Sequence, residues 1–274
     1  MARQSQFVPP LGTYTHFLPF ILMGVLVPPP PQPPPPQPQP GRVETVLVRQ
    51  PQTVPAYNNV NPPKDTAGVT LWGAYEKLPS LPTNATSRDG VLDIVVDSAS
   101  IPRNVASRYG LGSVVLGYSF AVPVNFAQYR YSYDIRVPRA NYANGSVAQV
   151  VGYFNFFDRI NKQNMWLGHI VFDTRCAAGT LVKWDQGTNT PVVNTRVPNF
   201  SCSTYGDWRS MSVTIGPQQI AWAAQQLRSK YPTLMLSSEP SHYNLTHINL
   251  NPETAAGTAR IDVGVRNWQL MGIK

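Results

Sequence analysis

The chain has 274 residues, of which 42% are hydrophobic and only 13% are charged, and its formal net charge is +8. Charged residues are about half as frequent as the ~25% usual in globular proteins, and the chain is rich instead in Asn, Gln, Ser and Thr, as many exported β domains are. The basic residues are sixteen Arg and six Lys. They are scattered, with no basic helix or recognisable nucleic-acid module, so nucleic acid is not an expected partner.

Residues 1–27 form a signal-like apolar segment. Phe17–Val27 is an uncharged run of eleven residues, and Arg3 is the only charge before Arg42. A helix needs about 20 apolar residues to span a bilayer, so the run predicts a secretory signal and a secreted or extracytoplasmic protein, at the cell surface or in the periplasm. No small-x-small cleavage site follows it. A retained shallow anchor, with peripheral membrane contact through residues 17–27, and a segment with no targeting role therefore stay open.

Residues 28–70 are predicted to be a Pro-rich extended linker. Pro28–Pro40 contains ten prolines in thirteen residues and predicts a stiff polyproline II rod. Four further prolines lie between residues 51 and 63. The compact domain is therefore expected to span residues 71–274.

This domain is predicted to consist mainly of strands. The clearest signal is Tyr129–Val137, where apolar and polar residues alternate without exception over nine residues. One face carries Tyr129, Tyr131, Tyr133, Ile135 and Val137, and the other carries Arg130, Ser132, Asp134 and Arg136. The other predicted strands are Val91–Asp97, Val114–Val122, Val147–Phe157, Trp166–Asp173, Ser210–Ile215, Thr246–Leu250 and Ala259–Ile273. In the last of these, the alternation changes phase at Asn267, which predicts a β-bulge.

One amphipathic helix is predicted over Pro217–Tyr231. Proline occupies its favoured first position, and Pro232 ends the helix. An apolar stripe recurs at 3.6-residue spacing through Ile220, Ala223, Ala224, Leu227 and Tyr231.

Many strands and a single helix favour an all-β fold, an antiparallel β-sandwich (jelly roll) preceded by the Pro-rich arm. The C-terminal strand ARIDVGVRNWQLMGIK, preceded by a helix-bearing connection, resembles the closing part of concanavalin-like and carbohydrate-binding-module jelly rolls. The resemblance is one of pattern over Leu71–Lys274. It implies a domain that binds or cleaves polysaccharide on a concave sheet.

Catalytic chemistry is not prominent in the sequence. A retaining glycosidase needs two carboxylates about 5 Å apart, and none of the four Glu has an acidic partner two residues away. Asp93 and Asp97 share a strand face but lie about 13 Å apart.

A polysaccharide lyase would need a Tyr or His base and groups that neutralise a uronate carboxylate. If three predicted strands were neighbours, Arg130, Gln149, Tyr153 and His169 would converge in these roles. Other polar residues on the same strand faces are Asp134, Arg136, Asn155 and Asp173. The motifs of the jelly-roll alginate lyases, Gln-x-His and Tyr-x-Lys-x-Gly, are absent.

Residues 176–202 contain the remaining candidates. Cys176 and Cys202 are the only cysteines and are predicted to form a disulfide, which would contribute about 3 kcal/mol in the chain-entropy model. Trp184 lies in a polar stretch between them and is a candidate for stacking on a ligand. No zinc motif is present, so no catalytic metal or cofactor is expected. The loop Asp185–Asn189 offers oxygen ligands that could hold a structural calcium, without EF-hand spacing.

The sequence therefore favours an exported protein that binds a polysaccharide or cell-surface glycan without turnover. The Arg excess predicts an acidic glycan, bound by Arg130, Asp134, Arg136, Tyr153, Asn155, His169 and Trp184. Two alternatives stay open, a polysaccharide lyase or glycoside hydrolase on the same scaffold and a structural or capsid-type jelly-roll protein. The oligomeric state is not predicted.

Overall fold

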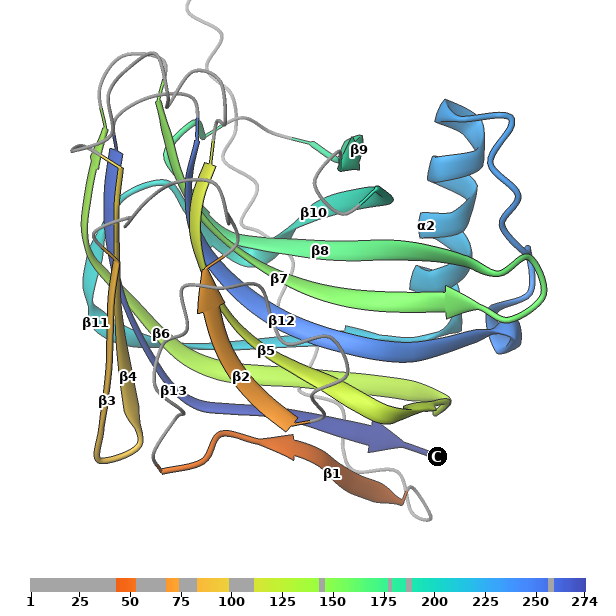
Figure 1. The fold of residues 1–274 in the computed structure, drawn as a ribbon, viewed down its shortest axis with the longest axis horizontal. Coiled ribbons are helices and arrows are strands. Elements are labelled where there is room, and N and C mark those ends of the chain that lie inside the picture. Colours follow the sequence, from red (N-terminus) through yellow and green to blue (C-terminus); the bar gives the residue numbers. More distant parts are fainter. Residues whose placement is uncertain are drawn as a thin grey trace, which may run out of the picture. The chain divides into compact units, whose positions relative to one another are not determined.

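A computed structural model describes residues 43–52, 68–73, 83–98, 111–142, 146–176, 179–185, 189–255 and 259–274. The signal-like segment 1–27 and the proline run 28–40 lie outside these residues. These residues belong to a compact unit that spans Gly41–Lys274, and within it the described residues form two β-sheets and one substantial helix (Figure 1). The predicted all-β, jelly-roll type of sandwich is thereby confirmed.

The first sheet has six strands. Its order is β11 (Tyr205–Ile215), β6 (Gln128–Tyr142), β13 (Ala259–Ile273), β4 (Val91–Asp97) and β3 (Thr83–Arg88), and β1 (Glu44–Arg49) also pairs with β13. All its pairs are antiparallel.

The second sheet has seven strands. Its order is β2 (Gly68–Gly73), β5 (Leu111–Val124), β12 (Tyr243–Ala255), β7 (Val147–Asp158), β8 (Gln163–Asp173), β10 (Thr190–Ser201) and β9 (Leu181–Asp185). Among the described strands, only the β8–β10 pair is parallel. The chain reaches the sheet edge at β9 and returns as β10, which inserts between β8 and β9 and so runs in the direction of β8.

The core fills the space between the two sheets. The predicted Tyr129–Val137 face is buried there, with Tyr131 and Ile135 fully shielded from solvent. Tyr131 also receives a hydrogen bond from the indole of Trp268 on β13 and donates one to the backbone oxygen of Asn249 on β12. The tyrosine hydroxyl thus links the two sheets inside an otherwise apolar core.

The predicted helix is confirmed as α2 (Pro217–Lys230). Gln219 Oε1 accepts a hydrogen bond from the Gly216 N–H at 3.0 Å, which satisfies a backbone donor at the start of the helix. The stripe Ile220, Ala223, Ala224 and Leu227 is buried in the core cluster, and α2 closes one end of the sandwich (Figure 1). A 3-10 turn, η1 (Pro240–His242), follows before β12.

The domain starts earlier than the sequence predicted. Strand β1 lies within residues 28–70, which were expected to be linker, and it pairs with β13 while Val48 is buried in the core. Strand β2 also begins before Leu71. The nearby prolines and the short length of β1 concealed its alternation. The paired β-structure therefore supports a domain boundary near Gly41.

Two local predictions are confirmed. The register of β13 against β6 shifts between Arg266 and Gln269, and Asn267 has a left-handed φ of 56°, as a bulge at this position requires. Cys176 and Cys202 form a disulfide with a Cα–Cα distance of 5.2 Å. The bond joins the exit of β8 to the end of β10, the two strands that pair in parallel.

Candidate functional site

The outer face of the six-stranded sheet carries Arg130 and Arg136, which the alternation on β6 placed there. Arg130 Nη2 lies 2.6 Å from a carboxylate oxygen of Glu44 on β1. Arg136 Nη2 lies 2.9 Å from Asp93 Oδ1 on β4. Both guanidinium groups therefore already have a carboxylate partner from a neighbouring part of the sheet.

Asp134 lies between these arginines and is also fully engaged. It accepts hydrogen bonds from Ser210 at 2.6 Å, Asn267 at 2.8 Å and Arg266 at 3.1 Å. Burial alone would raise its pKa, but these hydrogen bonds and the Arg266 charge lower the pKa of Asp134 overall. The carboxylate is thus held ionised by its own sheet.

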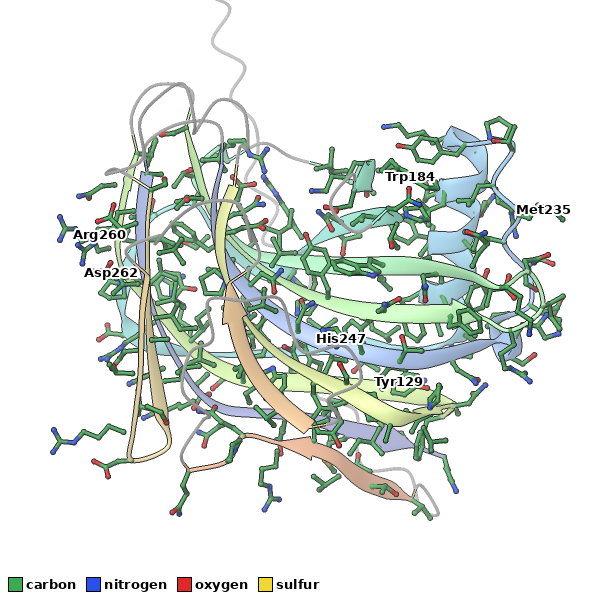
Figure 2. The ribbon with its side chains drawn as sticks, viewed as in Figure 1. Tyr129, Trp184, Met235, His247, Arg260 and Asp262 are labelled. Atoms are coloured by element: carbon green, nitrogen blue, oxygen red, sulfur yellow. A yellow bond between two sulfur atoms is a disulfide. The ribbon has the colours of Figure 1, made fainter. Side chains whose placement is uncertain are left out.

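The same pattern continues across this face. The Trp208 ring on β11 lies 4.8 Å from the guanidinium of Arg136 and 4.4 Å from that of Arg266. Figure 2 shows Arg260 and Asp262 near each other on β13, where Arg260 Nε lies 2.8 Å from Asp262 Oδ1. Ion pairs and cation–π contacts within the sheet therefore extend across this face.

His169 does not join these residues, and the expected convergence of Arg130, Gln149, Tyr153 and His169 is wrong. Strand β6 belongs to one sheet, whereas β7 and β8 belong to the other. His169 points into the core, where Nε2 lies 3.3 Å from the Tyr133 hydroxyl, and burial lowers its pKa to about 3. A β-bulge opposite Val150 and Val151 explains part of the error, because it breaks the alternation of β8.

The outer face of the seven-stranded sheet gathers Gln149, Tyr153 and Asn155, which alternate on β7. The register places Gln149 between Glu253 of β12 and Asp173 of β8. Farther along, the partners on β12 are Asn251, Asn249 and His247, and those on β8 and β10 include Trp166 and Asn194. We call this set the polar face: Gln149, Tyr153, Asn155, Trp166, Asp173, Asn194, His247, Asn249, Asn251 and Glu253.

Several polar side-chain atoms of the polar face are buried without a hydrogen-bond partner. Within the described part of the chain, nine side-chain nitrogen or oxygen atoms are buried with no partner, and five of them belong to this face. They are Oδ1 of Asn155, Asn194, Asn249 and Asn251, and Nε1 of Trp166. Each such atom costs about 1–3 kcal/mol unless a water or a ligand group satisfies it. Five of the nine atoms thus lie on one face of one sheet.

An apolar cluster adjoins these amides. Val151, Tyr153, Ile170 and Val192 are buried together on the outer side of the sheet, apart from the main core, with Trp166 and Phe200 packed against them. The rings of Tyr153 and Trp166 lie 5.2 Å apart. The face therefore combines aromatic surface with amide groups.

Gly168 makes this arrangement sterically feasible. A Cβ atom at this position would collide with Asn194 Oδ1 and with the Tyr153 ring at 2.7 Å. The two side chains can therefore cross over β8 from opposite sides only because residue 168 has no side chain.

Glu253 is the carboxyl group of most interest on the polar face. It is 7% exposed, and one of its oxygens accepts a hydrogen bond from the Gln149 amide. Burial raises the pKa of Glu253 above its ordinary value, and the Asp185 charge adds to the increase. Lys183, the Gln149 hydrogen bond and Arg175 act in the opposite direction. Lys183 and Asp185 lie on β9, so β9 is within electrostatic range of β12 although three strands separate them in the sheet.

Asp173 and Arg175 flank Glu253 on the other side of Gln149. Arg175 Nη2 donates to Asp173 Oδ2 at 2.7 Å and to Gln149 Oε1 at 2.8 Å, and Arg175 Nε donates to Asp173 Oδ1 at 3.0 Å. The hydrogen bonds that Arg175 donates to Asp173 raise the pKa of Arg175 further. Asp173 is thus a support for Arg175 and not a free carboxylate.

His247 lies at the opposite end of the polar face, on β12 (Figure 2). Its Nδ1 lies 2.9 Å from Ser119 Oγ of β5. Burial lowers the pKa of His247 to about 4, so the ring is neutral near pH 7. It can therefore offer a neutral polar edge but no positive charge.

Trp184 lies on β9 beside the end of α2 (Figure 2). Its ring contacts Tyr231 edge-on at 5.6 Å, and Nε1 donates to Asn189 at 3.1 Å. It is 36% exposed. Trp184 therefore anchors β9, the strand that carries Lys183 and Asp185, to the helix.

Sequence reasoning missed Asn194, Asn249, Asn251, Glu253 and Lys183. A signal for three of them was present, because His247, Asn249, Asn251 and Glu253 alternate with apolar or small residues along β12. The predicted strand ended at Leu250, two residues before Pro252, and so left out its last part.

No metal or membrane element emerges from the described residues. They contain no group of three or more His, Cys, Asp or Glu side chains placed to hold a metal ion. The proposed calcium loop Asp185–Asn189 lies partly outside the described residues. None of the described helices has the length and apolar character needed to cross a membrane.

Comparisons with known proteins give low similarities. No protein-family model and no curated protein sequence matches the chain. Among solved structures, a family 11 xylanase from Neocallimastix patriciarum is 10% identical, with a TM-score of 0.37 over 71% of this chain and 96% of that one. Endoglucanase 3 of Trichoderma harzianum, from family GH12, is 9% identical, with a TM-score of 0.38 over 70% and 83%. An endoglucanase from Rhodothermus marinus is 11% identical, with a TM-score of 0.35 over 70% and 85%. Similarities this low transfer no activity or site residue to this chain.

Proposed function

We propose that the polar face of the seven-stranded sheet binds a polysaccharide chain. The observation that carries this proposal is the set of five buried, unpartnered polar atoms on that face, next to the rings of Tyr153 and Trp166. A sugar presents several hydroxyl groups, each of which both donates and accepts hydrogen bonds, and an apolar ring surface that packs on aromatic groups. Such a ligand matches both parts of the face.

We propose an uncharged chain in place of the acidic glycan that the sequence predicted. That prediction rested on the net charge of +8 and the excess of Arg, and it assigned binding to Arg130 and Arg136. These two arginines lie on the other sheet and are paired with Glu44 and Asp93. On and around the polar face, the cations Arg175 and Lys183 are offset by the carboxyl groups of Asp173, Asp185 and Glu253. The amide groups are better suited to hydroxyls than to carboxylates.

A polysaccharide panel tests this proposal. Affinity electrophoresis of the purified protein through gels containing xylan, β-glucan, mannan, alginate or pectate measures binding, and the same series at 50 and 500 mM salt measures its electrostatic part. We expect retardation by one neutral polymer and little change with salt. Binding confined to alginate or pectate, and lost at high salt, would contradict the uncharged ligand. Binding that survives Asn249→Leu and Asn251→Leu would contradict the assignment to the polar face.

A second candidate is hydrolysis of the bound chain, with Glu253 as the proton donor. The specific observation is the burial of the Glu253 carboxyl group, which raises its pKa, with the negative charge of Asp185 adding to the increase. General acids are tuned in this way, and paired carboxylates are the machinery of glycoside hydrolysis. The spacing of acidic residues along single strands gave no hint of this pair, because its members come from β12 and β9.

Release of reducing ends separates cleavage from binding. If the chain is cleaved, Glu253→Gln should lower the rate by at least about a hundredfold while the polymer is still bound. Binding with no reducing ends from any polymer would leave the protein a binding module. We also propose that it acts outside the cytoplasm, because the only two cysteines form a disulfide, which persists in oxidising compartments.

A further inference from the structure

The polar face contains a hydrogen-bond chain whose direction is fixed by its first member. Arg175 has only donors, so the Gln149 atom that faces it must be the carbonyl oxygen. The amide N–H of Gln149 consequently points the other way, to Glu253. A glutamine without such a neighbour could rotate its amide by half a turn and present the oxygen to Glu253 instead.

Arg175 itself is held from both sides. Before it, Thr174 is fixed to β7, since its N–H donates to the Ala148 carbonyl and its hydroxyl accepts from the Ala148 N–H, both at 3.1 Å. After it, Cys176 has a left-handed φ of 52° and is bonded to Cys202 at the end of β10. The guanidinium is then oriented by two contacts to Asp173.

We infer that Arg175 is a positioning residue that fixes the Gln149 amide so that its N–H faces Glu253, and that the Cys176–Cys202 disulfide keeps Arg175 in place. With Gln149 donating to Oε1 of Glu253, a proton on Glu253 belongs on the other oxygen, Oε2. The hydrogen bonds from Arg175 to Gln149 and from Gln149 to Glu253 therefore determine which oxygen of Glu253 can donate to a ligand. Reduction of the disulfide loosens the first link and makes the site sensitive to redox conditions.

The charged groups around Glu253 set the direction of the expected effect. Gln149 comes from β7, Asp173 and Arg175 from β8 and the loop after it, and Lys183 and Asp185 from β9. The Gln149 hydrogen bond favours the ionised form of Glu253. If Arg175 no longer directs that N–H, the pKa of Glu253 must rise further. Arg175→Lys keeps the positive charge but replaces a planar fork with a single point of contact, so it tests the orientation and not the charge.

The direct test is the titration of Glu253 without any ligand. The chain has only four Glu residues, so ¹³C NMR of glutamate-labelled protein gives few carboxyl signals, and the one missing in Glu253→Gln identifies residue 253. We expect Arg175→Lys and Gln149→Met each to raise the midpoint of Glu253, and the double variant to raise it no more than the larger single effect. Arg260→Lys, which breaks a similar two-point contact with Asp262 on the other sheet, is the matched control and should leave the midpoint unchanged.

The disulfide is tested in the same way. Reduction, or the double variant Cys176→Ser with Cys202→Ser, should raise the midpoint of Glu253 in the otherwise unchanged protein and have no further effect in Arg175→Lys. An unchanged midpoint in Arg175→Lys, or an equal effect of reduction in both backgrounds, would overturn the inference. If the cysteine variants fold poorly, reduction of the protein with and without Arg175→Lys still tests the disulfide, and Gln149→Met tests the link from Arg175 to Glu253.

The consequence for the ligand rests on the proposed function and has its own readout. With the neutral polysaccharide bound most tightly in the panel, Arg175→Lys should weaken binding about tenfold, as expected for one misdirected hydrogen bond. If the intact protein binds no polysaccharide, the proposed function fails, while the titration still tests the hydrogen-bond chain. If binding is found but Arg175→Lys changes neither the affinity nor the titration midpoint of Glu253, the inferred positioning role of Arg175 is wrong and the proposed function stands.

Discussion

The outer faces of the two sheets differ in how their polar groups are satisfied. On the six-stranded sheet, Arg130, Arg136 and Arg266 each pair with an acidic side chain of the same sheet. On the seven-stranded sheet, Asn194, Asn249 and Asn251 are almost completely buried, and their side-chain oxygens have no partner among the described residues. The outer face of the six-stranded sheet thus pairs its charged groups internally, with only Arg136 Nε buried and unpartnered among its described atoms, whereas the polar face has five such atoms.

This difference teaches which residues of a sequence point to a ligand. Charged side chains attract attention, but a sheet surface can satisfy them internally by cross-strand pairing. Amide side chains are easily overlooked in a sequence. A buried amide oxygen without a hydrogen-bond partner in the protein needs a partner from water or a ligand. Under the proposed function, the overall charge of +8 does not indicate the charge of the ligand.

The largest expected effect is the loss of binding when two amides of the polar face are replaced. Asn249→Leu with Asn251→Leu should weaken polysaccharide binding by about a hundredfold or more, because each substitution removes hydrogen bonds worth about 1–3 kcal/mol. The melting temperature should stay equal or rise, since both substitutions remove unpartnered buried polar atoms. Ser132→Val with Gln269→Leu, a hydrogen-bonded pair on the other sheet, is the control and should leave binding unchanged. A large loss of stability with unchanged affinity would show that the amides serve the fold.

The next effect is on stability and concerns β1, which completes the six-stranded sheet. Removing residues 1–40 should leave the free energy of unfolding nearly unchanged, because the compact unit begins at Gly41. Removing residues 1–50 should cost about 2–4 kcal/mol, through loss of the β1–β13 pairing and of buried Val48. Urea unfolding of the two truncated proteins measures the difference. Equal stabilities would place the boundary after β1.

The sequence predicted the strands whose two faces differ in polarity. Tyr129–Val137 alternates perfectly, because one side packs in the core and the other meets solvent. The sequence pattern did not predict β10, because Val192 and Val193 are both buried and polar and apolar residues do not alternate there. It also missed β3, a run of small polar residues, Thr83–Arg88.

The candidate site was less predictable than the fold, and Gln149, Tyr153 and Asn155 were found only because they alternate on one strand. Glu253 and Asn194 join them through strand pairings that no local pattern specifies. The disulfide was predictable because the chain offers only one pair of cysteines.

A third prediction uses pH to contrast one carboxyl group from each face. The pKa of Asp134 is lowered, so its stabilising effect is present above its ordinary pKa and is lost as pH falls through the lowered value. The pKa of Glu253 is raised, so its ionisation costs stability as pH rises above its ordinary pKa toward the raised value. At pH 7, Asp134→Asn should therefore lower the melting temperature and Glu253→Gln should raise it. Both differences should shrink on acidification. Differences of the same sign at pH 7 would contradict the assigned environments.

The smallest expected effect is that of Arg130→Ala, which separates the two faces most directly. The Arg130 and Glu44 side chains are 39% and 35% exposed, and ion pairs of this kind contribute about 0–1 kcal/mol. The melting temperature should therefore fall by at most a few degrees, and polysaccharide affinity should not change at low or high salt. Arg136→Ala should cost somewhat more stability, because its guanidinium also packs on Trp208, and again nothing in affinity. If either variant weakens binding in a salt-dependent way, the outer face of the six-stranded sheet takes part in recognition. The acidic glycan predicted from the sequence then becomes the better description of the ligand.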